Sequence, residues 1–187
     1  MEVIDQVPTK ESFDKAFMEV ERKVERKLRQ LKIDPDTLQV TIGFNEIITN
    51  PIDGGDDNEV ITNEYKVKSA RIPHKDLTNK VNKLTKFAMA LNEINDENEK
   101  AYSVCKIKID GDMLLRQSRV TMTISHKVER TGKNVLIPVS QVTMYGNSDF
   151  VDAEKMSRII EEIDKEVWEY LGGKYNDHTP NQLALFR

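Results

Sequence analysis

Three stretches of the chain carry apolar residues at alternating steps of three and four, the spacing of one face of an α-helix. The first stretch begins after Pro8 and Thr9, and Pro35 follows its end. The second covers about 75–95 and the third about 152–171. The predicted buried stripes are, in order, Phe13, Phe17, Val20, Val24, Leu28 and Leu31; Leu77, Val81, Leu84, Phe87, Ala88, Leu91 and Ile94; and Met156, Ile159, Ile160, Ile163, Val167, Trp168 and Leu171.

Between these stretches apolar and polar residues alternate with a period of two, which is typical of strands with one buried face. The alternation predicts strands over 38–49, 60–72, 101–110, 114–129 and 135–145, with Pro138 indicating that the last lies at a sheet edge. The predicted order is α-β-β-α-β-β-β-α. Short connections favour antiparallel pairing, so we expect an α+β fold: a mainly antiparallel sheet of about five strands packed with three amphipathic helices.

The chain divides into a predicted single domain at 1–173 and a C-terminal tail at 174–187. Gly172 and Gly173 end the last helix, and the polar linker 174–181 carries Pro180. A polar segment of this kind buries too little apolar surface to order itself, so we expect a mobile, extended tail. Three large apolar residues then follow near the chain end.

That apolar segment reads Gln182-Leu183-Ala184-Leu185-Phe186. It resembles the peptide by which bacterial DNA polymerases and repair proteins attach to the replicative sliding clamp. The resemblance implies that Leu185 and Phe186 fill an apolar pocket, Leu183 packs beside them, and Gln182 hydrogen-bonds at the rim. It covers about five residues, and so implies a partner and not a fold. The alternative is that these residues fold back onto their own domain.

Composition places the chain among soluble globular proteins. Charged residues make up 32% and apolar residues 38% of its 187 positions, and the formal net charge is −4. No apolar run approaches the roughly 18 residues of a membrane span, so we expect no membrane partner. Cys105 is the single cysteine, which points to a reducing cytoplasm.

No strong catalytic signature is present, so we lean towards a protein without enzymatic activity. One weak pattern resembles the Asp…Glu-x-Lys site of a large nuclease superfamily: Glu64 and Lys66, with Asp53 or Asp56 in the preceding loop. The resemblance implies two carboxylates that hold Mg²⁺ and a lysine that positions the attacking water. An ordinary solvated turn explains the acidic loop equally well. No other cofactor is expected.

Charge is unevenly distributed along the chain. The residues considered for contact with DNA phosphates are Arg22, Lys23, Arg26, Lys27, Lys66, Lys68 and Arg71. The exposed side of the last helix is predicted to be acidic, with Glu154, Glu161, Glu162, Asp164, Glu166 and Glu169. Such asymmetry orients a protein on a charged partner. The alternative is that the lysines only solvate a surface.

Three functions fit these patterns. The first is an accessory protein of bacterial or phage DNA replication, recombination or repair that docks on the sliding clamp, and either recruits an activity or blocks the pocket. The second is a Mg²⁺-dependent nuclease. The third is a phage structural or assembly protein whose tail docks on a neighbouring copy.

Overall fold

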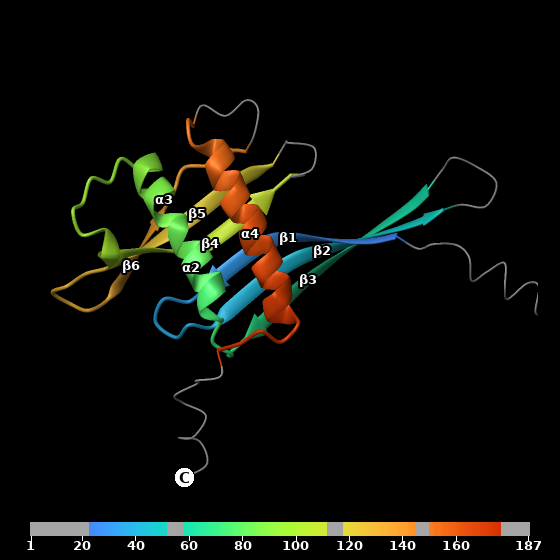
Figure 1. Cartoon of the computed structure of the whole chain (residues 1–187), viewed down its shortest axis with the longest axis horizontal. Coiled ribbons are helices and arrows are strands. Elements are labelled where there is room, and N and C mark those ends of the chain that lie inside the picture. The colour runs from blue at the N-terminus through green and yellow to red at the C-terminus, as the bar shows by residue number, and fades with distance from the viewer. Residues whose placement is uncertain (1–22, 52–57, 112–117, 145–149, 177–187) are drawn as a thin grey trace, which may run out of the picture. The chain divides into compact units, whose positions relative to one another are not determined.

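The computed structural model describes residues 23–51, 58–111, 118–144 and 150–176, and Figure 1 shows their helices and strands. The chain divides into two compact units. The first consists of residues 1–27 and 45–65, and the second of residues 28–44 and 66–187. The boundary falls within the first three strands.

The strands form one seven-stranded sheet. Its order is β3-β2-β1-β4-β5-β6, with the short β7 paired to β5. The pairs β1–β4, β4–β5, β5–β6 and β5–β7 are antiparallel. The strands are β1 (Lys23–Ile33), β2 (Val40–Pro51), β3 (Asn58–Ser69), β4 (Tyr102–Asp110), β5 (Arg119–Lys127), β6 (Asn134–Pro138) and β7 (Val142–Thr143).

The described helices belong to the second unit and cover one face of its part of the sheet (Figure 1). They are α2 (Lys75–Lys83), α3 (Thr85–Leu91), the 3₁₀ turn η1 (Glu99–Ala101) and α4 (Ala153–Leu171). Leu84 is both the C-cap of α2 and the N-cap of α3, so these two helices form one interrupted helix. The apolar stripes of α2, α3 and α4 meet the inward residues of β4 and β5 in a single core, which includes Leu84, Val120, Met122 and Ile160.

The predicted first helix is wrong over its second half, because Lys23–Ile33 forms β1. Leu28 and Leu31 are buried as predicted, but Val24 is 48% exposed. β1 pairs with β4 through Gln30 opposite Lys108 and Leu31 opposite Ile107. This non-local pairing outweighs the helix propensity of a segment rich in Arg, Lys, Glu and Gln, which is only a weak preference.

The prediction of about five strands and three helices is therefore wrong: the sheet has seven strands, and the described helices are the interrupted α2–α3 pair and α4. The predicted strand over 135–145 also divides in two. β6 ends at Pro138, where the missing N–H interrupts the ladder. The chain then rejoins β5 at Val142, which lies opposite Val120.

The described part of the first unit consists of strand segments. Arg26 Nε donates to Glu46 Oε1 at 3.0 Å, and the Tyr65 hydroxyl lies 3.4 Å from the other oxygen of the same carboxylate. Val60 is 60% exposed and Ile61 38% exposed in this unit, so its described segments carry apolar side chains in solvent.

Candidate functional site at the start of the C-terminal tail

The chain reverses direction immediately after α4. Gly172 caps the helix, and Gly173 adopts a φ of +110°, a conformation that side-chain-bearing residues rarely take. The Lys174 amide donates to the Glu169 carbonyl at 3.0 Å. The turn therefore directs the Lys174 side chain back along α4.

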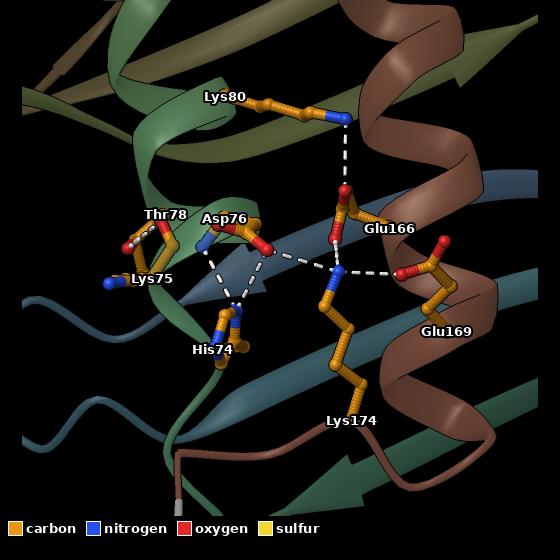
Figure 2. A network of polar contacts seen from close by, with 8 residues as sticks. All are labelled: His74, Lys75, Asp76, Thr78, Lys80, Glu166, Glu169 and Lys174. Atoms are coloured by element: carbon orange, nitrogen blue, oxygen red, sulfur yellow. Dashed lines mark hydrogen bonds and ion pairs between the residues drawn. The ribbon is translucent and has the colours of Figure 1, made fainter.

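Lys174 is the centre of a charged cluster that joins α2 to α4 (Figure 2). Its ammonium group lies 2.6 Å from a Glu169 oxygen, 2.9 Å from Glu166 Oε2 and 3.1 Å from Asp76 Oδ2. Lys80 of α2 reaches the other Glu166 oxygen at 2.9 Å. We call Asp76, Lys80, Glu166, Glu169 and Lys174 the Lys174 cluster.

Glu166 is the most enclosed member of the cluster. Its side chain is 9% exposed, whereas that of Glu169 is 54% exposed. A carboxylate so far removed from water requires partners for both oxygens, and Lys80 and Lys174 supply them. The prediction that Glu166 belongs to the exposed acidic side of the last helix is wrong.

The ion pairs shift the pKa values of Lys174, Glu166 and Asp76 in the directions that keep these three groups charged. Hydrogen bonds to Glu166, Glu169 and Asp76 raise the pKa of Lys174. The hydrogen bond from Lys174 lowers the pKa of Glu166 and, separately, that of Asp76. A lysine held in its protonated form is a poor general base and a poor nucleophile, and its three ion pairs join α2 to α4.

Tyr175 and Asn176 extend this attachment to the segment between β3 and α2. Tyr175 forms a β-bridge with Pro73, and the Asn176 amide donates to the Ile72 carbonyl at 3.1 Å. The Tyr175 ring meets the Tyr170 ring edge to face at 5.0 Å, and the Arg71 guanidinium lies 4.5 Å from its centroid. The chain is thus fixed at Asn176, the last described residue.

Several predicted site residues lie outside the described part of the chain: Gln182, Leu183, Leu185 and Phe186 of the tail, Asp53 and Asp56 of the acidic loop, and Arg22. Glu64 is exposed on β3 in the first unit, and Lys66 is exposed on β3 in the second. No group of three or more His, Cys, Asp or Glu residues capable of holding a metal occurs in the described ranges. The nuclease remains a prediction.

The predicted phosphate-contacting residues are divided between the two units. Lys23, Arg26 and Lys27 belong to the first, where Arg26 pairs with Glu46 and Lys27 lies 3.6 Å from Glu25. Lys66, Lys68 and Arg71 belong to the second, where Arg71 lies over Tyr175.

A cleft of about 500 Å³ opens elsewhere in the second unit, between the 34–38 loop, α2 and the β5–β6 hairpin. Asp36, Thr78, Cys105 and Asn134 are among its lining residues. Burial raises the pKa of the Cys105 thiol, so the sulfur is protonated at neutral pH and is a poor nucleophile. The cleft therefore contains no activated cysteine.

Comparison with known proteins assigns no family: no family model matches the chain, and no curated protein or solved structure matches it. Within the described segments, no helix has the length and apolar character needed to cross a membrane.

Proposed function

We propose that this chain is a DNA replication, recombination or repair accessory protein of the bacterial cytoplasm, and that it docks on the sliding clamp through Gln182, Leu183, Leu185 and Phe186. The sequence of this peptide is the observation that carries the proposal. The attachment at Asn176 supports it, because the motif begins six residues after a point held on the body by the Ile72 carbonyl.

Chain length sets how far from the body the peptide can bind. Each extended residue spans at most about 3.3–3.6 Å, so six residue steps place Gln182 within roughly 20 Å of Asn176. A short tether keeps the body near the clamp surface without requiring contact between the two. The body is then free to carry its own interactions.

The apolar residues of the peptide supply most of the binding free energy. Burying Leu183, Leu185 and Phe186 contributes about 1.5–3 kcal/mol each before the cost of ordering the segment. That cost removes part of the gain, so a single peptide should bind with a micromolar dissociation constant, about −8 kcal/mol. The attachment chemistry is the same for a protein that recruits an activity and for one that blocks the clamp pocket.

Binding of the purified chain to an immobilised bacterial sliding clamp tests the proposal. Leu185→Ala/Phe186→Ala should weaken binding by roughly 100-fold or more, since it removes two anchors worth about 1.5–3 kcal/mol each. The matched control is Val135→Ala/Leu136→Ala, because these two apolar residues of β6 are 48% and 55% exposed. The control should bind as the parent chain does. Equal affinities for the parent and the tail variant would contradict the proposal.

A further inference from the structure

The two faces of the sheet in the second unit differ in character. Val120, Met122 and Ile124 of β5 alternate towards the helices and are buried in the core, as are Ile107 and Ile109 of β4. The residues between them lie on the opposite face, since successive strand residues point to opposite sides. No described helix covers this second face (Figure 1), which we call the open face.

Register identifies the side chains that share the open face. In β1 and β4, Lys32 lies opposite Lys106, and Gln30 lies opposite Lys108. In β5, Thr123 and Thr121 continue the same rows, and Arg119 lies opposite Asp110. Directly opposed residues of an antiparallel pair project to the same side, so these residues form one contiguous surface.

The strands on the other side of β1 extend the open face. Phe44 of β2 meets Trp168 of α4 at 5.1 Å, which places Thr41 and Gly43 on the open face by alternation. Ser69 of β3 lies close enough to Tyr170 of α4 for its side chain to lower the pKa of the Tyr170 hydroxyl. Lys68 and Lys66 therefore point to the side away from the helices, which is the open face.

The open face is strongly cationic. Six cations are among the residues placed on it above: Lys32, Lys66, Lys68, Lys106, Lys108 and Arg119. Asp110, which pairs with Lys108 at 3.1 Å, is the single acidic residue that the second unit's strands contain. The charges of these six cations and this one acid sum to +5, whereas the whole chain carries −4.

The arrangement of Lys32 and Lys106 points to an external anion. Like charges directly opposite each other destabilise an antiparallel pair. No described acid lies within ion-pair distance of either ammonium group, although the carboxylate of Asp34 acts on Lys32 from farther away. A polyanion bound across the rows would remove this repulsion.

We propose that the open face binds the sugar–phosphate backbone of duplex DNA without reading its sequence. Lysines and threonine hydroxyls are the groups that contact phosphates and position a protein on a duplex. The open face includes no aromatic side chain among its described residues, whereas proteins that bind single strands add aromatic platforms for the bases. The acidic side of α4, with Glu154 and Glu162, belongs to the helix layer, so repulsion favours approach of DNA from the open face.

The proposal uses none of the tail residues. It deepens the proposed function by giving a clamp-tethered protein a surface for the DNA that passes through the clamp. The two ideas fail separately, because DNA binding by the free chain requires no clamp.

Fluorescence anisotropy of the full chain with a labelled duplex of arbitrary sequence tests the proposal. We expect a dissociation constant of about 10⁻⁴–10⁻⁶ M near physiological salt, with affinity falling steeply between about 50 and about 200 mM salt. Lys32→Gln/Lys106→Gln/Lys108→Gln should lower the affinity at least about tenfold. The same variant should reduce the slope of log K against log salt by about 2–3, because each phosphate that a lysine neutralises adds about 0.9 to that slope.

The matched control is Lys75→Gln/Lys86→Gln/Lys165→Gln, which changes the net charge equally but alters exposed lysines of α2, α3 and α4. It should bind DNA as the parent does, and so should Leu185→Ala/Phe186→Ala. Thermal melting should show the open-face variant about as stable as the parent, because it removes the like-charge pair Lys32–Lys106 and, besides that, only the exposed Lys108–Asp110 ion pair. Equal losses of affinity in the two triple variants would overturn the proposal. Binding only to single-stranded DNA, or only to anionic lipid vesicles, would also overturn it.

Discussion

Glu166 and Glu169 bind the same lysine from the same helix, yet substitution of the two should have unequal effects. Glu169 has the shorter contact with the Lys174 ammonium, 2.6 Å against 2.9 Å for Glu166. Its side chain is 54% exposed, however, whereas that of Glu166 is 9% exposed and also holds Lys80. If burial outweighs distance, Glu166→Gln should be the more damaging change.

The expected magnitudes follow from exposure. An exposed ion pair contributes about 0–1 kcal/mol, so Glu169→Gln should lower the free energy of unfolding by less than about 1 kcal/mol. Breaking a fully buried pair costs about 3–5 kcal/mol. Because both lysines of the cluster remain partly solvated, Glu166→Gln should cost about 1–3 kcal/mol, or roughly 3–10 °C in melting temperature for a chain of this size.

Urea unfolding of the parent and both variants at neutral pH measures the difference. The variants control for each other, since each removes one negative charge from the last two turns of α4. Near 1 M salt the Debye length falls to about 3 Å, so the effect of Glu169→Gln should vanish while that of Glu166→Gln persists. If Glu169→Gln costs as much as Glu166→Gln, the argument that burial decides is refuted.

Two further predictions concern the same segment. Lys174 lowers the folded-state pKa of Asp76 and of Glu166. Both carboxylates therefore stabilise the fold above their ordinary pKa values of 3.8 and 4.5, respectively, and this stabilisation is lost as the pH falls through the lowered values. Lys174→Gln should therefore make the free energy of unfolding less dependent on pH below about pH 4.5, as measured by urea titrations at a series of acidic pH values. If the variant and the parent lose stability equally as the pH falls, other groups control the acid dependence. Gly173→Ala should lower the free energy of unfolding by about 1–3 kcal/mol at neutral pH, because the φ of +110° strains any residue with a side chain, although no atom lies within 4 Å of the added carbon. A Gly173→Ala variant as stable as the parent would indicate that the turn adopts another conformation without loss of stability.

The spacing of apolar residues predicts a helix or strand correctly where tertiary packing favours the same secondary structure. The apolar stripe of the last helix predicted α4 to within a residue or so, and the alternation over 101–110 predicted β4. Periodicity failed for β1, where apolar residues at 24, 28 and 31 fit a helical face. The strand state depends on pairing with residues 106–108, which lie more than seventy positions away and leave no mark in the local sequence.

The Lys174 cluster and the open face were missed for the same reason. Lys80 and Glu166 are 86 positions apart, so no spacing rule brings them together. The sequence did show that Lys66 and Lys68 alternate on a strand, but sheet order decides that Lys32 and Lys106 join them on one face. The tail peptide differs from both, because its resemblance to clamp-binding peptides depends on five consecutive residues. It can therefore be recognised from the sequence without knowledge of the fold.

The most direct test of the account compares two chains by calorimetric titration into purified sliding clamp: the full chain, and a chain that ends at Asn176. The shorter chain keeps the Lys174 cluster and the Tyr175 contacts, so its body should be unchanged. We predict a micromolar dissociation constant for the full chain and no measurable heat of binding for the shorter one. Equal binding by both, or no binding by either, would contradict the claim that this protein docks on the clamp through its C-terminal peptide.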